Sequence, residues 1–193
     1  MRRRLASIDS EFTYGSYASV HAIMNQLLES SKEPVMKSIH RCRDNHPVDS
    51  NERFSNSCEI MTMGASALLG YSVQECMENF SIPVSATCPE CRNELVRSFS
   101  FAFHPPILSI ELWQRPRMLD SFLHIEAGGL RRQYKLRGVI YFACQHFTCR
   151  VITGNGMIWF HDGLSGGSSL IYESVDILSI PTEDSILAIY IQC

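Results

Sequence analysis

Two short motifs carry the residue types that bind metal ions. Cys88 and Cys91 stand in C-x2-C spacing, and Cys42 lies four positions before His46, with His40 as a spare imidazole nearby. Structural zinc sites take four cysteine or histidine ligands, commonly from two such turns. We therefore predict a zinc site made of Cys42, His46, Cys88 and Cys91. The alternative is that Cys88 and Cys91 are free thiols near a turn.

A second group of residues offers a thiol and an imidazole close together in sequence. Cys144 and His146 are two positions apart on a predicted strand, so their side chains would share a face. Same-face neighbours on a strand lie roughly 6.5–7 Å apart, which is too far for a thiol–imidazole hydrogen bond. Cys149 would point to the opposite face. We expect both cysteines to be ordinary core or neutral thiols rather than nucleophiles.

The composition predicts a folded, intracellular chain. Apolar residues make up 45% of the 193 residues and charged residues 19%, which suits one globular domain. The net charge of −3 provides no broad basic face for nucleic acid. No apolar run approaches the ~20 residues that span a bilayer, so we expect no membrane association. No secretory signal is visible, so we expect the cysteines to be free rather than disulfide-bonded.

Helical patterns occur in the first part of the chain. Residues 17–29 place an apolar stripe on one face, which predicts an amphipathic helix. Residues 31–58 are polar and interrupted by prolines, so we expect irregular structure there. Residues 72–80 predict a short helix in which Ser72 and Glu75 form a capping box.

From residue 95 onward the pattern is that of strands. Short β-branched or aromatic segments alternate with breaks rich in glycine or proline, and Thr153 to Met157 predicts a tight hairpin turn around Asn155-Gly156. The expected strands are 95–103, 107–115, 134–143, 146–153, 157–163, 170–174 and 186–193. Helices followed by a mostly antiparallel sheet make an α+β fold.

The order of these segments resembles the C-terminal half of the ubiquitin-specific proteases. The segments are PPILSIELWQRP, YKLRGVIYFACQHFTCRVI, WFHDG and ILAIYIQC, preceded by a helix, SVQECMENF, that also has a family counterpart. The resemblance covers about residues 80–193 well and the earlier part loosely. It implies a papain-like cysteine protease fold, with a palm sheet, a fingers region that often carries zinc, and a thumb that is largely missing.

The resemblance also assigns site residues. His146 matches the catalytic histidine, with Phe147 where the family usually has tyrosine, and Gln145 replaces the usual glycine. Asp162 is the best match for the acidic residue that orients the histidine, although it lies one position short of the family spacing. A side chain at Gln145 would crowd the cleft through which a substrate tail passes. A histidine of this kind accepts the proton of a cysteine thiol and is held by its acidic partner.

The nucleophilic cysteine of this family has no counterpart in the sequence. Residues 19–28, SVHAIMNQLL, align with the family helix that follows the cysteine box, so the box itself would lie upstream of Met1 and be absent.

The alternative for His146 is an ordinary strand histidine with a satisfied hydrogen bond.

The resulting prediction is a single ubiquitin-specific-protease-like domain over residues 1–193. Residues 17–29 would be a remnant of the thumb side, residues 40–100 a fingers-like region, and residues 101–193 the palm with the histidine strand. The implied reaction is hydrolysis of the isopeptide bond at the C-terminus of ubiquitin or a similar modifier, with no activity in this chain alone. The alternatives are a non-catalytic ubiquitin-binding or protein-binding module and an unrelated zinc-containing α+β protein.

Overall fold

The computed structural model describes most of the chain from residue 36 onward. The described residues are 36–48, 52–55, 60–61, 72–78, 81–112, 118–162, 164 and 169–193. The helix predicted at 17–29 lies outside these ranges. None of the helices within them has the length and hydrophobicity needed to cross a bilayer.

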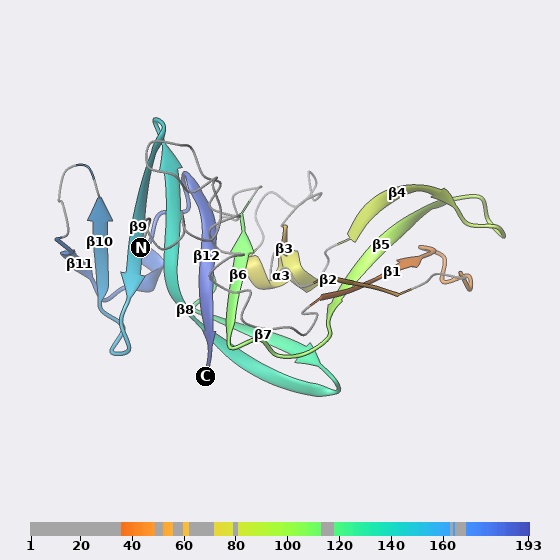
Figure 1. Ribbon diagram of the computed structural model, residues 1–193, viewed down its shortest axis with the longest axis horizontal. Coiled ribbons are helices and arrows are strands. Elements are labelled where there is room, and N and C mark those ends of the chain that lie inside the picture. Colours follow the sequence, from red (N-terminus) through yellow and green to blue (C-terminus); the bar gives the residue numbers. More distant parts are fainter. Residues whose placement is uncertain are drawn as a thin grey trace, which may run out of the picture.

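The strands form two sheets at opposite ends of the long axis of the molecule (Figure 1). The smaller sheet has the order β2-β1-β5-β4 and is antiparallel throughout. Its strands are β1 (Met36–Arg41), β2 (Arg53–Ser55), β4 (Ser81–Thr87) and β5 (Glu94–Phe101).

The larger sheet has eight strands in the order β11-β10-β9-β8-β12-β6-β3, with β7 paired to β8. Among the strand pairs that the structure describes in this sheet, β3–β6 is parallel and the others are antiparallel. The strands are β3 (Ile60–Met61), β6 (Ile107–Glu111), β7 (Phe122–Ala127), β8 (Leu130–Ala143), β9 (His146–Ile152), β10 (Ile158–Asp162), β11 (Ile171–Ser174) and β12 (Ser185–Gln192). A short 3-10 helix, η2 (Ile177–Ser179), precedes β12.

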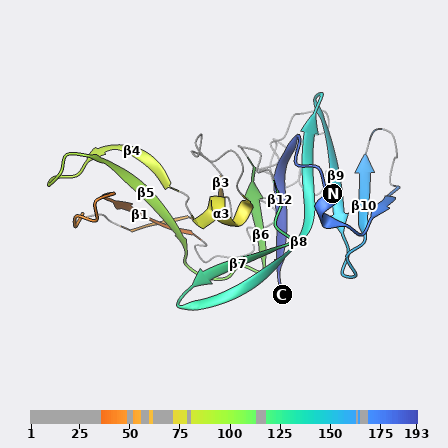
Figure 2. The same ribbon diagram turned by 180° about the vertical axis from the view of Figure 1, so that it is seen from behind.

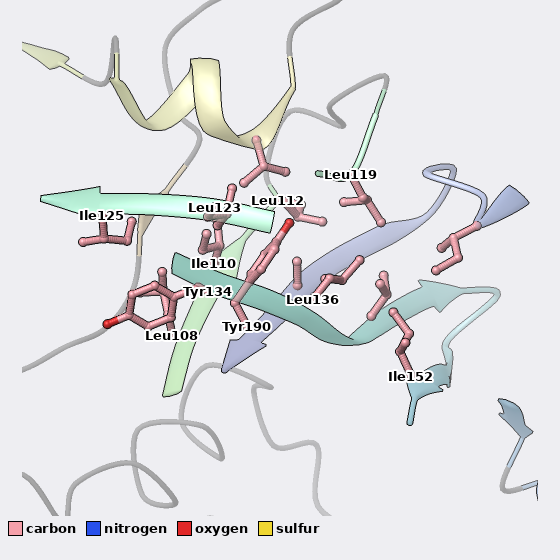
Figure 3. Packing of buried hydrophobic residues seen from close by; sticks show 14 of the residues in the cluster. Leu108, Ile110, Leu112, Leu119, Leu123, Ile125, Tyr134, Leu136, Ile152 and Tyr190 are labelled. Carbon is pink, nitrogen blue, oxygen red and sulfur yellow. The ribbon is translucent and has the colours of Figure 1, made fainter. Parts of the chain in front are cut away.

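The main core lies on one face of the larger sheet, where β7 crosses over β6, β8 and β12 (Figure 3). Three buried tyrosines belong to this core, and each hydroxyl donates to a backbone carbonyl. Tyr134 donates to Pro105, Tyr190 to Asp120 and Tyr141 to Pro181, over 2.7, 3.1 and 3.0 Å. Each tyrosine thus buries its ring without leaving its hydroxyl unsatisfied.

The helix α3 (Val73–Glu78) lies between the two sheets (Figure 2). Its capping box is present as predicted, because Glu75 N–H donates to Ser72 Oγ at 3.3 Å and Ser72 N–H donates to the Glu75 carboxylate at 3.1 Å. The Gln74 side-chain amide also bonds both backbone groups of His124, over 2.7 and 3.1 Å. The helix therefore supplies hydrogen-bond partners to backbone groups on the edge of β7, which would otherwise have to pair with another strand.

The described part of the chain is mostly antiparallel sheet with few helices. The strands predicted from residue 95 onward are confirmed, and so is the hairpin turn, in which Thr153 N–H bonds Met157 O at 3.0 Å. The expected irregularity of residues 31–58 is wrong at β1 and β2, and β3, β4 and β7 were not predicted from the sequence. These strands are short or carry many polar residues, and backbone pairing with neighbours decides their conformation.

Candidate functional site

His146 and Asp162 meet at one end of the larger sheet. His146 is the first residue of β9 and Asp162 is the last residue of β10. These strands are antiparallel, with Asp162 opposite Thr148, so His146 lies on the same face two residues further along. Its Nε2 is 2.6 Å from Asp162 Oδ1, and the two side chains are 26% and 20% exposed. The pair is thus in contact and also accessible.

The hairpin between β9 and β10 sets the register that makes this contact. Thr153 and Met157 close the turn, and Gly156 takes the left-handed conformation with φ +85°. Glycine adopts this conformation without the steric cost that a Cβ brings. A one-residue slip of either strand would turn one of the two side chains to the other face.

Asp162 is held in place by a backbone group as well. The amide of Leu164 donates to Asp162 Oδ1 at 2.8 Å, which fixes the orientation of the carboxylate. Since the carboxylate faces Nε2 of His146, the other ring nitrogen, Nδ1, is the atom that can accept a proton from an incoming group.

Cys144 lies in the turn before His146, and not on a strand as the sequence predicts. Cys144 and Gln145 form the two-residue turn between β8 and β9, and both have positive φ, +50° and +62°. Cys144 is exposed in this turn rather than on a strand, so the expected same-face spacing from His146 does not apply and that expectation is wrong. A two-residue turn with positive φ at both positions favours asparagine and glycine, and Gln145 is strained there.

Cys149 is on the face opposite to His146, as expected. In the sheet register it is directly opposite Ile140 and His161. Burial raises the pKa of the Cys149 thiol, so the thiol is more firmly protonated than a free cysteine and is a poor nucleophile.

Arg150 lies in β9 on the same face of the sheet as His146, four residues further along the strand. Its guanidinium lies 4.9 Å from the ring centroid of Tyr141 and 5.1 Å from that of Phe160. It also donates to both carboxylate oxygens of Glu173, at 2.7 and 2.9 Å. One side chain therefore ties β8, β9, β10 and β11 together. The sequence does not reveal this role of Arg150, because only the register of the strands brings the four residues together.

The four predicted metal ligands form a cluster in the smaller sheet. The ligand atoms of Cys42, His46, Cys88 and Cys91 all lie within 4.8 Å of one another. His46 Nδ1 is 3.6 Å from Cys42 Sγ and 3.7 Å from Cys88 Sγ, and the sulfurs of Cys42 and Cys91 are 3.5 Å apart. Three thiols and an imidazole at such distances can surround one tetrahedral zinc ion.

Each pair of ligands comes from one tight turn. Asn45 N–H donates to Cys42 O at 3.1 Å, and Arg92 N–H donates to Cys88 O at 2.9 Å. Both donors have positive φ, +58° and +60°. The Asn93 amide joins the two turns by donating to Asp44 at 2.9 Å. The local backbone thus presents the ligands from both turns to one point.

The surroundings of the cluster favour a cation. Backbone N–H groups, first that of Cys91, lower the pKa of the Cys88 thiol to about 6, whereas burial and the neighbouring thiols of Cys42 and Cys88 raise the pKa of the Cys91 thiol. The Cys88 thiol therefore releases its proton to a metal at neutral pH. The Glu90 carboxylate lies 3.9 Å from His46 Nε2, on the side of the ring away from the sulfurs and beyond hydrogen-bonding distance. The cluster could therefore bind zinc, as the sequence predicts.

Comparisons with known proteins give matches in structure only. No protein-family model matches the chain, and no curated protein matches its sequence. Chains of two structures of the SAGA DUB module Ubp8/Sgf11/Sus1/Sgf73, one bound to ubiquitin aldehyde and one bound to monoubiquitin, match with TM-scores of 0.67 and 0.64 at 12% identity. A yeast SAGA DUB module matches with a TM-score of 0.58 at 11% identity.

These matches define the fold of the chain. They cover 92–100% of this chain but only 46–53% of the matched chains, so the chain spans about half their length. The chain therefore has a fold like that of ubiquitin-specific proteases. At such low identity the likeness concerns the fold alone, and what the site does is a separate question.

Proposed function

We propose that this chain is the palm and fingers part of a papain-like, thiol-dependent deubiquitinase domain. The family reaction would be hydrolysis of the isopeptide bond at the C-terminus of ubiquitin or a related modifier. The observation that carries the proposal is the 2.6 Å contact between His146 Nε2 and Asp162 Oδ1, in a fold otherwise found in DUB modules bound to ubiquitin.

In the proposed chemistry, His146 is the general base. Its Nδ1 takes the proton from a cysteine thiol, and the thiolate attacks the carbonyl carbon of the modifier's last residue. The imidazolium that forms is stabilised by Asp162, which also keeps the ring from rotating. His146 then returns the proton to the leaving amine, and water activated by the same imidazole cleaves the remaining thioester to release the modifier's carboxylate and the thiol.

We also propose that the chain alone does not catalyse this reaction. Cys149 points away from His146 and has a raised pKa, and Cys144 lies in the exposed, strained turn. Neither residue has the environment of an activated thiol. In the same proposal the chain works in an intracellular, reducing compartment, where free thiols persist.

The second candidate function is binding without catalysis. It is favoured by the environments of Cys144 and Cys149, since a domain in which neither of these thiols is activated next to His146 can still bind a modifier between its palm and fingers.

The test combines cleavage and binding on the purified chain. Hydrolysis of a ubiquitin–aminomethylcoumarin conjugate by the wild type should equal that of His146→Ala and be negligible, while a calorimetric titration should detect ubiquitin binding. Cleavage that His146→Ala abolishes would confirm the roles of the pair and contradict the proposed inactivity. Absence of both binding and cleavage would contradict any ubiquitin-directed function.

A further inference from the structure

The metal cluster lies at one end of the molecule, and β9 and β10, which carry His146 and Asp162, lie at the other (Figure 1). Cys42 follows β1, while Cys88 and Cys91 stand between β4 and β5. Chemistry at these three sulfurs is therefore independent of the proposed deubiquitinase site.

One pair of sulfurs bridges the two turns directly. Cys42 Sγ and Cys91 Sγ are 3.5 Å apart, although 49 positions separate them in the chain. A disulfide bond is about 2.05 Å long, so the two sulfurs need to approach each other by only roughly 1.5 Å to form one. A side-chain adjustment of that size leaves the strand register unchanged.

Backbone and side-chain hydrogen bonds hold the two turns in this arrangement. Cys88 N–H donates to Asn93 O at 2.8 Å, and the Asn93 side chain donates to Asp44 at 2.9 Å. Next to the turns, β1 pairs with β5 as far as Arg41 and Val96. The sulfurs of the two turns therefore remain neighbours when a metal ion leaves.

The three sulfurs differ in their access to solvent. Cys42 and Cys88 are buried, with 3% and 1% of their surfaces exposed, whereas Cys91 is partly exposed. A thiol that coordinates zinc is a thiolate, so in the loaded site the three cysteines differ in access rather than in protonation. A small oxidant in solution therefore meets the sulfur of Cys91 first.

We propose that the metal cluster is a redox switch, at which hydrogen peroxide releases zinc and leaves a disulfide between Cys42 and Cys91. The proposal rests on zinc binding at this cluster and not on the proposed function of His146. The disulfide joins the same two turns that the metal joins, so oxidation replaces one cross-link by another. Thiol reductants reverse the reaction.

The reaction transfers two electrons from the sulfurs to the peroxide. The Cys91 thiolate attacks one peroxide oxygen, the O–O bond breaks, and a sulfenic acid and a hydroxide ion form. The Cys42 thiolate then attacks the Cys91 sulfur, which forms the S–S bond and expels a second hydroxide ion. Two protons from solvent convert the hydroxide ions to water. Zinc retains only Cys88 and His46 as protein ligands and dissociates, because a structural zinc site needs four.

Zinc release and disulfide mapping on the zinc-loaded chain test the proposal. Hydrogen peroxide is added in steps, and a chelating pyridylazo dye reports free zinc by its absorbance. The oxidised chain is then alkylated, digested without reductant and mapped by mass spectrometry. We expect about one zinc ion to be released per molecule, together with a cross-linked pair of peptides that contain Cys42 and Cys91. Dithiothreitol and added zinc should restore the original zinc content.

Two matched variants locate the reacting sulfur. Cys91→His and Cys88→His each replace one sulfur by a nitrogen that zinc also accepts. Cys91→His removes the accessible sulfur, so we expect zinc release by peroxide to slow about tenfold or more. Cys88→His keeps Cys42 and Cys91, so we expect release at nearly the wild-type rate. The exposed Cys144 and Cys193 lie outside the cluster, and the double variant Cys144→Ser/Cys193→Ser should change neither the rate nor the cross-link.

Four results would each overturn the proposal. They are a purified chain without zinc, zinc that stays bound at peroxide concentrations that oxidise Cys193, a map without the cross-link between Cys42 and Cys91, and equal release rates in Cys91→His and Cys88→His. The mapping uses the wild type, so it decides the question even if a variant fails to bind zinc. None of these measurements uses ubiquitin, so this proposal and the proposed function can fail separately.

Discussion

The chemistry of single residues is decided by which atom of each side chain faces its neighbour. His146 presents Nε2 to Asp162, so Nδ1 is the nitrogen that an incoming thiol would meet. His46 presents Nδ1 to the sulfurs of Cys42 and Cys88, and Nε2 faces Glu90. A carboxylate thus lies beside one nitrogen of each imidazole, in hydrogen-bonding contact at His146 and 3.9 Å away at His46.

The metal cluster makes a prediction about stoichiometry. Chain purified from zinc-supplemented culture should contain about one zinc ion per molecule, because the four ligands complete a tetrahedral site. Cys88→Ser should lower the content to near zero, as measured by inductively coupled plasma mass spectrometry. Cys193→Ser removes an exposed thiol outside the cluster and should leave the content unchanged. Equal zinc content in the two variants would exclude this site.

The turn before His146 makes a prediction about strain. Gln145→Gly should raise the free energy of unfolding by about 1 kcal/mol, because glycine tolerates the left-handed conformation that glutamine occupies at φ +62°. Gln133→Gly, at an exposed position within β8, should instead lower it by roughly 0.5–1 kcal/mol. Urea denaturation measures both. A stabilising effect of both substitutions, or of neither, would show that the turn is not strained.

At the scale of elements, neighbouring strands are joined by individual side chains as well as by backbone ladders. Gln74 joins α3 to β7, and Arg150 joins the last four strands at the β11 end of the sheet. The Arg150 contacts extend over β8, β9, β10 and β11. They therefore stabilise the part of the larger sheet that ends at β11.

Loss of the Arg150 side chain should therefore destabilise β11 more than the strands inside the sheet. We expect Arg150→Gln to lower the free energy of unfolding by about 1–2 kcal/mol, since it removes a bidentate ion pair and two cation–π contacts. Hydrogen exchange should accelerate in β11 and change little in β12, which lies inside the sheet. Arg132→Gln, at an exposed position of β8, is the control. An equal acceleration in both variants would mean that Arg150 has no special role.

At the scale of the whole molecule, the two sheets have very different cores. The larger sheet and α3 share a large apolar cluster, which Met36 of β1 and Phe99 and Phe101 of β5 join from the near end of the smaller sheet. The core around the metal ligands contains only three buried residues, two of which are ligands themselves, Cys42 and Cys88, together with Leu95. Zinc bound by the four ligands would therefore add much of the stability of this end of the smaller sheet.

Chelation should accordingly act on one end of the molecule. Treatment with a zinc chelator should accelerate hydrogen exchange in residues 42–48 and 84–96, while β8 and β12 keep their protection. Re-addition of zinc should restore the original pattern. Uniform acceleration throughout the chain, or none, would contradict the view that the metal supports only the smaller sheet.

The sequence also predicted much of the local structure. Alternating apolar residues predicted the strands from residue 95 onward, and Ser72 with Glu75 predicted the capped start of α3. These features depend on residues close together in the chain, so local patterns suffice to predict them. The β1, β2, β3, β4 and β7 strands escaped prediction because their pairing partners, rather than their own composition, make them strands.

The sequence by itself determined which residue types were available for chemistry: two ligand pairs, a histidine and an acidic residue at the ends of two strands. Only the tertiary structure decided which of these meet. It brought Cys42 and His46 to Cys88 and Cys91 across two turns, and His146 to within 2.6 Å of Asp162. It also placed Cys144 in a turn rather than on a strand. The reason is that strand register and sheet order set distances between residues far apart in the chain.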